Sequence, residues 1–240
     1  MRNIKAVFIK QRQSLIKMPL MLGQAVFFIL FIALMMFFFG RDEPCADCIP
    51  AYVCAECQEE RPAPGFGGMM TVMFVGMTLI GSASALVTED KSTQNLRFMR
   101  MAGVKPFQYL IGTASIKFAM AMACVVGFAV AGRYFEHFFL FVLVTGLGAL
   151  ISILFGIAAG LSKYPALTTP ISILLGMGPM LASFNDNLER WLSFTYTMQI
   201  RFAVGDLSED LTQNFLIIGA NGLFVLLLFI FLHRKGEMQW

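Results

Sequence analysis

The segment Thr88–Gln108, TEDKSTQNLRFMRMAGVKPFQ, is a short charged stretch between two long apolar runs. Its pattern predicts a short helix over Gln94–Met101, because Ser92 or Thr93 can cap the start and Gly103 can end it. A helix placed between two apolar runs in this way would stand at the surface of a membrane. The alternative is a solvated loop whose basic residues only fix the orientation of the chain.

The expected helix has one apolar face. Leu96, Met99 and Gly103 share that face at helical spacing, whereas Arg97 and Arg100 lie on other faces. A short amphipathic helix at a membrane surface is suited to being pushed by a soluble partner. We therefore expect Leu96 and Met99 to press into a groove of that partner.

The composition of the whole chain is that of a membrane protein. Of its 240 residues, 58% are hydrophobic and 14% are charged, whereas soluble domains have about 25% charged and 45–50% apolar residues. Several apolar runs reach the roughly 20 residues that a helix needs to cross a bilayer. The sequence predicts one all-α polytopic membrane domain over residues 1–240, with little chain left for a soluble domain.

The apolar runs define six expected transmembrane helices. They cover Leu20–Phe39, Gly67–Val87, Tyr109–Gly132, Phe138–Leu161, Pro165–Ser183 and Phe215–Leu232. Before the first of them, residues 1–18 predict an amphipathic helix lying on the membrane, because apolar and basic residues can separate onto two sides.

An even number of spans puts both ends of the chain on one side of the membrane. If the ends are cytoplasmic, the inner segments hold twelve of the 18 Lys and Arg residues and the outer loops hold five, while Lys117 lies within the third span. Positive charge collects on the cytoplasmic side of membrane proteins. We therefore expect a multi-pass protein of the plasma membrane with both termini in the cytoplasm.

Two features inside the spans suggest specific contacts. Lys117 lies about 12 Å into the third span, where an ionisable residue is a functional candidate, although the sequence favours a side chain that reaches back to the inner interface. The fourth span carries small residues at a four-residue step, namely Gly148, Ser152, Gly156 and Gly160. Such a stripe predicts close approach of another helix, either as static packing or as a sliding seam.

The segment 184–213 is too apolar for a loop in water. We expect two short helices that dip into the outer leaflet, with Trp191, Phe194, Tyr196 and Met198 among their apolar residues. The alternative is a flat interfacial helix anchored by its aromatic side chains.

Four cysteines cluster in the first outer loop, residues 40–66. Cys45, Cys48, Cys54 and Cys57 form two C-x-x-C pairs. Their close spacing is shorter than that of common zinc sites, and the loop is expected on an oxidising side, so disulfides are favoured and zinc is the alternative. Cys124, in the third span, is expected to pack as a small apolar residue.

The chain lacks the motifs of an enzyme. It has no phosphate-binding G-x-x-x-x-G-K-[ST] run, no H-E-x-x-H pair, and two histidines that stand far apart in the sequence. If ATP drives this protein, a separate polypeptide must hold the nucleotide. No catalytic residue, no resident metal other than the possible zinc, and no contact with nucleic acid are expected.

The order of these features resembles the permease subunits of the type-2 family of ATP-binding-cassette exporters. The resemblance covers essentially the whole chain. Its motifs are an acidic–basic cluster at the end of the second span, then Ser or Thr, a Leu-rich helix, and a Gly or Pro break before the third span. The matching residues are Glu89, Asp90, Lys91, Ser92, Thr93, Leu96, Met99, Gly103, Pro106 and Tyr109.

The resemblance implies a mechanism. In that family the segment corresponding to 88–108 is a coupling helix that docks on a cytosolic ATPase, and a re-entrant helical pair lines the exit. By this likeness the coupling residues are Glu89, Asp90, Thr93, Leu96, Arg97, Met99, Arg100 and Gly103. ATP and magnesium would bind a pair of ATPase subunits, and a second copy or a sister chain would complete the pathway.

The cargo expected from this reading is amphipathic or hydrophobic, such as a drug, an antimicrobial peptide or a lipid-like molecule. Two other classes remain open, a stand-alone secondary transporter and a non-transporting immunity or scaffold protein. The first usually has ionisable residues deep in its helix bundle, for which Lys117 is the single candidate.

Overall fold

The computed structural model describes residues 65–131, 137–182, 184–205 and 211–234, together with three isolated positions at Gly23, Val26 and Leu30. The expected surface helix of residues 1–18 and the four cysteines of the outer loop lie outside these residues, as does nearly all of the first expected span. Every regular element in the described ranges is a helix.

Five of the described helices are long and apolar enough to cross a membrane, at Gly68–Ser92, Pro106–Val130, Phe138–Leu161, Pro165–Ala182 and Thr212–Phe231. They correspond to the second to sixth expected spans, which are thereby confirmed as helices of the required length and composition. Each consists largely of aliphatic and aromatic residues, so the backbone must satisfy its own hydrogen bonds in an apolar surrounding, and a helix does so within one segment.

The elements follow one another along the chain with short connections. Their bounds are α4 Gly65–Met73, η1 Phe74–Leu79, α5 Ile80–Ser92, α6 Asn95–Met101, α7 Pro106–Ala131, α8 Phe138–Leu161, η2 Pro165–Leu167, α9 Thr168–Ala182, α10 Asp186–Leu192, α11 Tyr196–Gly205 and α12 Leu211–Arg234. The first three join into one long helix whose middle, η1, is a π-helical turn. The predicted bounds of the fourth span, Phe138–Leu161, agree with those of α8.

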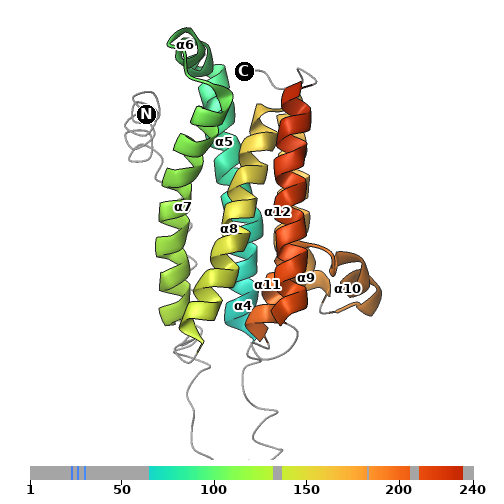
Figure 1. Ribbon diagram of the computed structural model, residues 1–240. Helices are drawn as coiled ribbons and strands as arrows, with labels where there is room; N and C mark the ends of the chain where they lie inside the picture. The colour runs from blue at the N-terminus through green and yellow to red at the C-terminus, as the bar shows by residue number, and fades with distance from the viewer. Residues whose placement is uncertain are drawn as a thin grey trace, which may run out of the picture.

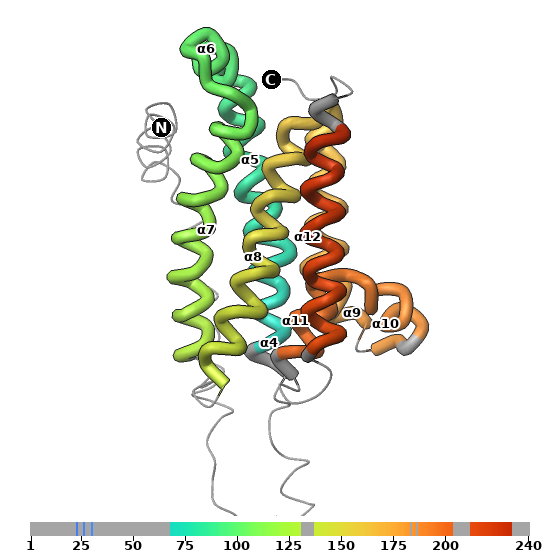
Figure 2. The backbone as a smooth tube through the Cα atoms, viewed as in Figure 1, coloured from blue at the N-terminus to red at the C-terminus, as the bar shows by residue number. Residues whose placement is uncertain are grey.

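The long helices run alternately up and down. Figure 1 shows α6 at one end of the bundle, beyond the ends of α8 and α12, with α10 projecting sideways near the opposite end. The backbone tube in Figure 2 shows that α12 finishes at the end that carries α6. We call these the α6 end and the α10 end.

The helix α8 lies in the middle of the bundle and packs against α5, α7, α11 and α12. Its stripe of small residues serves two different neighbours. At Gly156, an added Cβ would lie 2.5 Å from the carbonyl oxygen of Ile80, and Gly160 meets Ser84 and Val87 of α5 in the same way. Gly148 instead receives the side chain of Ile200 from α11.

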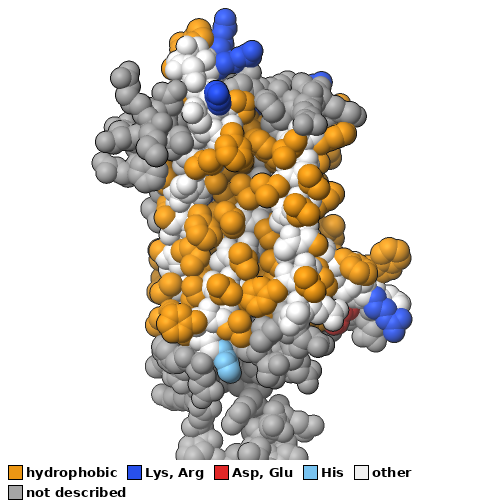
Figure 3. Space-filling model, viewed as in Figure 1, with side chains coloured by type: hydrophobic (Ala, Val, Ile, Leu, Met, Phe, Trp, Pro, Cys, Tyr) orange, Lys and Arg blue, Asp and Glu red, His pale blue; other side chains and the backbone are white. Residues whose placement is uncertain are grey.

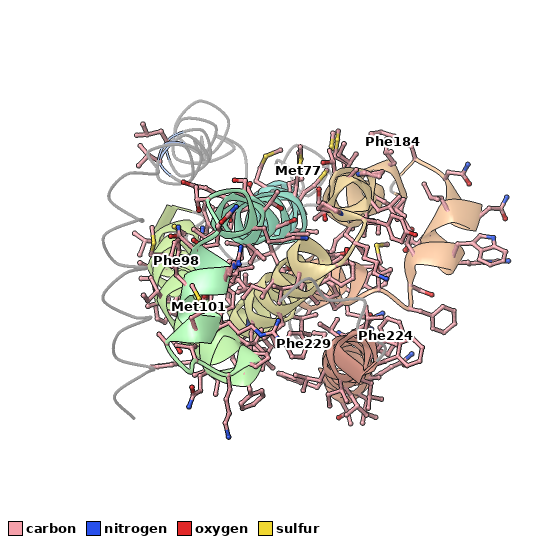
Figure 4. All side chains as sticks on the ribbon, turned by 90° about the horizontal axis from the view of Figure 1, so that it is seen from above. Met77, Phe98, Met101, Phe184, Phe224 and Phe229 are labelled. Atoms are coloured by element: carbon pink, nitrogen blue, oxygen red, sulfur yellow. The ribbon has the colours of Figure 1, made fainter. Side chains whose placement is uncertain are left out.

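A second close approach joins η1 to α9. A Cβ on Gly76 would lie 2.7 Å from backbone atoms of Leu175 and Gly176, and a Cβ on Gly176 would meet Met77. Met77 and the neighbouring α9 are seen together in Figure 4. Pro179 has no N–H and therefore cannot donate a helical hydrogen bond to the carbonyl oxygen of Leu175. That carbonyl oxygen lies against Gly76, which has no side chain to obstruct it.

Candidate functional site

The connection between α5 and α6 differs from the predicted one. Ser92 and Thr93 were expected to cap the short helix, but α5 extends to Ser92 and both hydroxyls bond back to the carbonyl oxygen of Glu89, at 2.9 and 2.8 Å. Hydroxyls can bond the preceding turn of a helix in this way. The helix α6 instead begins after Gln94, which adopts a left-handed conformation with φ 55° and no side-chain cap.

The end of α6 is the one that the sequence predicts. Gly103 has φ +77°, a conformation that glycine adopts without a steric penalty. The N–H of Gly103 donates to the carbonyl of Arg100, and that of Val104 donates to Met99, both at 3.0 Å. This paired pattern is the Schellman motif, and it turns the chain into α7.

The apolar face of α6 points into the protein, contrary to the prediction that it meets a partner. Leu96 is 3% exposed and belongs to the hydrophobic core, and Met99 packs against that core. The exposed apolar residues of α6 are Phe98, at 60%, and Met101, at 66%. Figure 4 shows both on α6, seen from the α6 end. Since Leu96 faces α5 and the bundle, a soluble partner cannot reach it.

A buried carboxylate ties the segment to the next span. The Tyr109 hydroxyl donates to Asp90 at 2.9 Å, and the amide of Asn95 donates to the other carboxylate oxygen at 3.4 Å. Asp90 is 4% exposed and Tyr109 is fully buried. Hydrogen bonds to a charged group are stronger than neutral ones, so this contact joins α5, α6 and α7 firmly.

The remaining predicted coupling residues lie around this anchor. Glu89, Thr93, Arg97 and Arg100 are exposed. Lys91 donates to the carbonyl oxygens of Gly160 and Ser162 at 3.4 and 3.0 Å, so its cation lies at the C-terminal end of α8, where the helix dipole favours positive charge. The α6 end therefore has an exposed, basic and partly aromatic tip on a buried base.

The Lys117 side chain was expected to reach back toward the inner interface, but it lies inside the bundle instead. Its side chain is 3% exposed, and its ammonium group lies 3.4 Å from the carbonyl oxygen of Ser82 on α5. Because Ser82 lies ten residues before the end of α5, the ammonium is well inside the bundle. Between their terminal turns, the five candidate spans contain no other Asp, Glu, Lys, Arg or His residue.

The segment between α9 and α12 forms two short helices, as predicted, but its four candidate residues separate. Trp191 of α10 is 82% exposed and Phe194 is 74% exposed, whereas Tyr196 and Met198 of α11 are buried. The Tyr196 hydroxyl lies 2.6 Å from that of Ser152 on α8. The four residues therefore lie in different surroundings, because α11 is buried in the bundle and α10 is not. Their place in a re-entrant exit segment remains a prediction.

Two polar contacts hold this pair of helices in place. Arg201 of α11 donates to the carbonyl oxygen of Pro179 in α9 at 2.8 Å, and Asn221 of α12 donates to that of Phe194 at 2.9 Å. The first puts a cation at the C-terminal end of α9, where its dipole favours positive charge. Neither contact was predicted, because each joins residues far apart in the chain.

The described residues test only part of the cysteine and metal predictions. Cys124 is a buried free cysteine in the core, which agrees with its expected role as a packing residue. In the described ranges no group of three or more His, Cys, Asp or Glu residues could hold a metal ion. The disulfide and zinc alternatives for the outer loop remain predictions.

Comparison of the chain with protein-family models, with curated proteins and with solved structures gave no match.

Proposed function

We propose that this chain is the transmembrane permease subunit of an ATP-driven exporter of the type-2 ATP-binding-cassette kind, which moves an amphipathic or hydrophobic cargo out across the plasma membrane. A separate pair of cytosolic ATPase subunits would bind ATP and magnesium. A second copy of the chain, or a sister chain, would complete the pathway. In this proposal the α6 end faces the cytoplasm.

The observation that carries the proposal is the form of α6. It stands beyond the ends of the neighbouring spans (Figure 1), exposes Phe98 and Met101, and is fixed at its base by Leu96 and by the Asp90–Tyr109 bond. A solvated loop needs neither exposed aromatic residues nor a buried anchor. A helix that transmits a push needs a surface to receive the force and a stiff connection to the spans.

The charge distribution supports the orientation. The described side chains at the α6 end include five basic residues, Lys91, Arg97, Arg100, Lys105 and Lys163, against the acidic Glu89 and Asp90. Figure 3 shows Lys and Arg side chains at this end above a largely hydrophobic surface, and a further basic group on the part that projects sideways near the opposite end. The exit would lie at the α10 end, where α11 is held within the bundle and the aromatic residues of α10 would rest in the outer interface.

The test is the association of the chain with its ATPase. Phe98→Asp should lower ATPase co-purification and cargo-stimulated ATP hydrolysis, because a buried Phe contributes roughly 1.5–3 kcal/mol and a desolvated carboxylate opposes docking. The affinity should fall at least about tenfold. Phe98→Leu, which keeps an apolar side chain, should retain most of the association. Normal co-purification of the Asp variant would remove α6 as the coupling site.

Lys117 favours a second candidate, a stand-alone secondary transporter. A buried ammonium in a membrane bundle is a common site of ion coupling. The two functions separate experimentally, because an exporter of the proposed kind needs its ATPase, whereas a secondary transporter works in vesicles that contain this chain alone and an ion gradient. Lys117→Met should abolish the gradient dependence only in the second case.

A further inference from the structure

A lateral groove runs along the bundle between α7 and α12, with α8 as its floor. Its volume is about 260 Å³, and its walls include Phe107, Ile111 and Phe118 of α7 and Leu226 of α12. Leu150 and Leu154 of α8 lie at the bottom. The helices α7 and α12 both pack on α8, which leaves the space between them open on the face shown in Figure 3.

The lining is apolar and does not require a ligand with polar groups. Ser115 is the polar residue of the lining, and its hydroxyl already donates to the carbonyl oxygen of Ile111 at 2.7 Å. A ligand in this groove therefore gains hydrophobic contact and loses no hydrogen bond. A hydrocarbon chain meets that condition.

The length and the position of the groove match one leaflet of a bilayer. From Phe107 to Phe118 the helix rises by about 16 Å, which is close to half of the roughly 30 Å hydrocarbon core. Phe107 is the second residue of α7, at the α6 end. The groove thus occupies the half of the bundle that adjoins the basic tip, and its mouth lies at the level of lipid head groups.

The charge at the mouth selects among lipids. Lys105 is exposed and precedes Phe107 by two residues, and Arg100 of α6 is exposed at the same end. A basic side chain near the membrane surface attracts an anionic head group by about 1 kcal/mol. Together, the apolar trough and the cation fit a molecule that has one anionic head and one extended hydrocarbon chain.

We propose that this groove is a binding site for one acyl chain of an anionic phospholipid from the leaflet at the α6 end, with Lys105 at the head group. A second copy of this chain or another segment of the same chain could also cover an apolar groove. The basic mouth and the one-leaflet length favour the lipid. The site does not depend on the exporter proposal, because lipid binding needs no ATPase.

The experiment uses the low tryptophan content of the chain, which has two, Trp191 and Trp240. In a Trp191→Phe/Trp240→Phe background, Leu226→Trp places a fluorescent reporter on the groove wall. Leu227→Trp is the matched control, because Leu227 follows Leu226 directly, is 55% exposed and lies outside the groove lining. Each variant is reconstituted in mixed phosphatidylglycerol and phosphatidylcholine vesicles in which one lipid or the other carries bromine, a quencher of tryptophan fluorescence.

The quenching of the Leu226→Trp reporter measures the relative affinity of each lipid for the groove. This affinity should be about fivefold higher for phosphatidylglycerol than for phosphatidylcholine. Leu227→Trp should show nearly equal quenching by the two lipids. Adding Lys105→Gln should remove the preference at Leu226→Trp and change nothing at Leu227→Trp. Equal quenching by both lipids at the groove reporter would overturn the proposal in favour of unselective lipid contact. No quenching by either lipid would overturn it in favour of a protein occupant.

Discussion

At the scale of single residues, buried polar groups distinguish this bundle from a simple set of apolar rods. Asp90 and Lys117 are each almost fully buried, and each meets a group on a neighbouring helix, the hydroxyl of Tyr109 and the carbonyl oxygen of Ser82. Both contacts join α5 to α7. In an apolar surrounding such bonds stabilise a particular arrangement, because leaving a polar group unpaired costs more than the bond itself contributes.

The bond between Asp90 and Tyr109 gives a prediction about stability. Tyr109→Phe should destabilise the protein by about 1.5–3 kcal/mol, because it removes a hydrogen bond to a buried carboxylate. Thr145→Val is the control, since the Thr145 hydroxyl is buried and has no hydrogen-bond partner in the described structure. That change should be neutral or stabilising. Thermal unfolding in detergent measures both, and equal melting temperatures for wild type and Tyr109→Phe would show that the bond adds nothing.

At the scale of the elements, glycine sets how closely the helices approach. The π-helical turn η1 brings Gly76 against Gly176 of α9, and Gly156 of α8 lies against Ile80 of α5. In a membrane, where apolar burial does not drive helices together, small residues allow the contacts that hold them. A π-turn within a long helix is common at functional sites. This one lies where the second span meets the helix that contains Pro179.

Two glycines of the same span should therefore respond differently to substitution. Gly76→Ala should destabilise the protein by about 1–3 kcal/mol, because the added methyl meets backbone atoms of α9, which have little freedom to move. Gly81→Ala should be tolerated or stabilising, because nothing lies within 4 Å of its added Cβ and alanine favours a helix. Melting temperatures of the two variants in the same detergent test this, and a Gly76 variant as stable as the Gly81 variant would contradict the packing.

At the scale of the whole molecule, the bundle has a largely apolar surface along its middle and two dissimilar ends. The α6 end is basic, and the α10 end carries the exposed aromatic residues Phe184, Trp191 and Phe194. Exposed tryptophan is typical of the boundary between lipid and water, and positive charge is typical of the cytoplasmic side. The molecule thus has an expected direction in the membrane as well as a fold.

The orientation gives the prediction at this scale. A fluorescent reporter that folds only in the cytoplasm, fused after Trp240, should fluoresce. A membrane-impermeant thiol reagent, applied to intact cells after reduction, should label the cysteines at positions 45–57. A fused enzyme that is active only outside the cytoplasm serves as the control and should be inactive after Trp240. The reverse pattern of reporters would overturn the assignment of the α6 end to the cytoplasm.

Local sequence signals determined where most of the described helices lie along the chain. The length and apolar content of the spans predicted five described helices, because a backbone in an apolar surrounding must bond to itself within each segment. The end of α6 was equally predictable, since Gly103 needs only its own φ of +77° and bonds from the preceding turn. Such features depend on residues within one or two helical turns.

Only the tertiary structure decided which way these helices face. A periodic pattern shows that Leu96 and Met99 share a side of α6, but the same pattern suits a side turned toward a partner or toward the bundle. The bond from Tyr109 to Asp90 and the burial of Lys117 depend on how α5 lies beside α7, and the pairing of Ser152 with Tyr196 depends on where α11 enters the bundle. Their physical origin is packing between segments that are distant in the chain, which no local pattern contains.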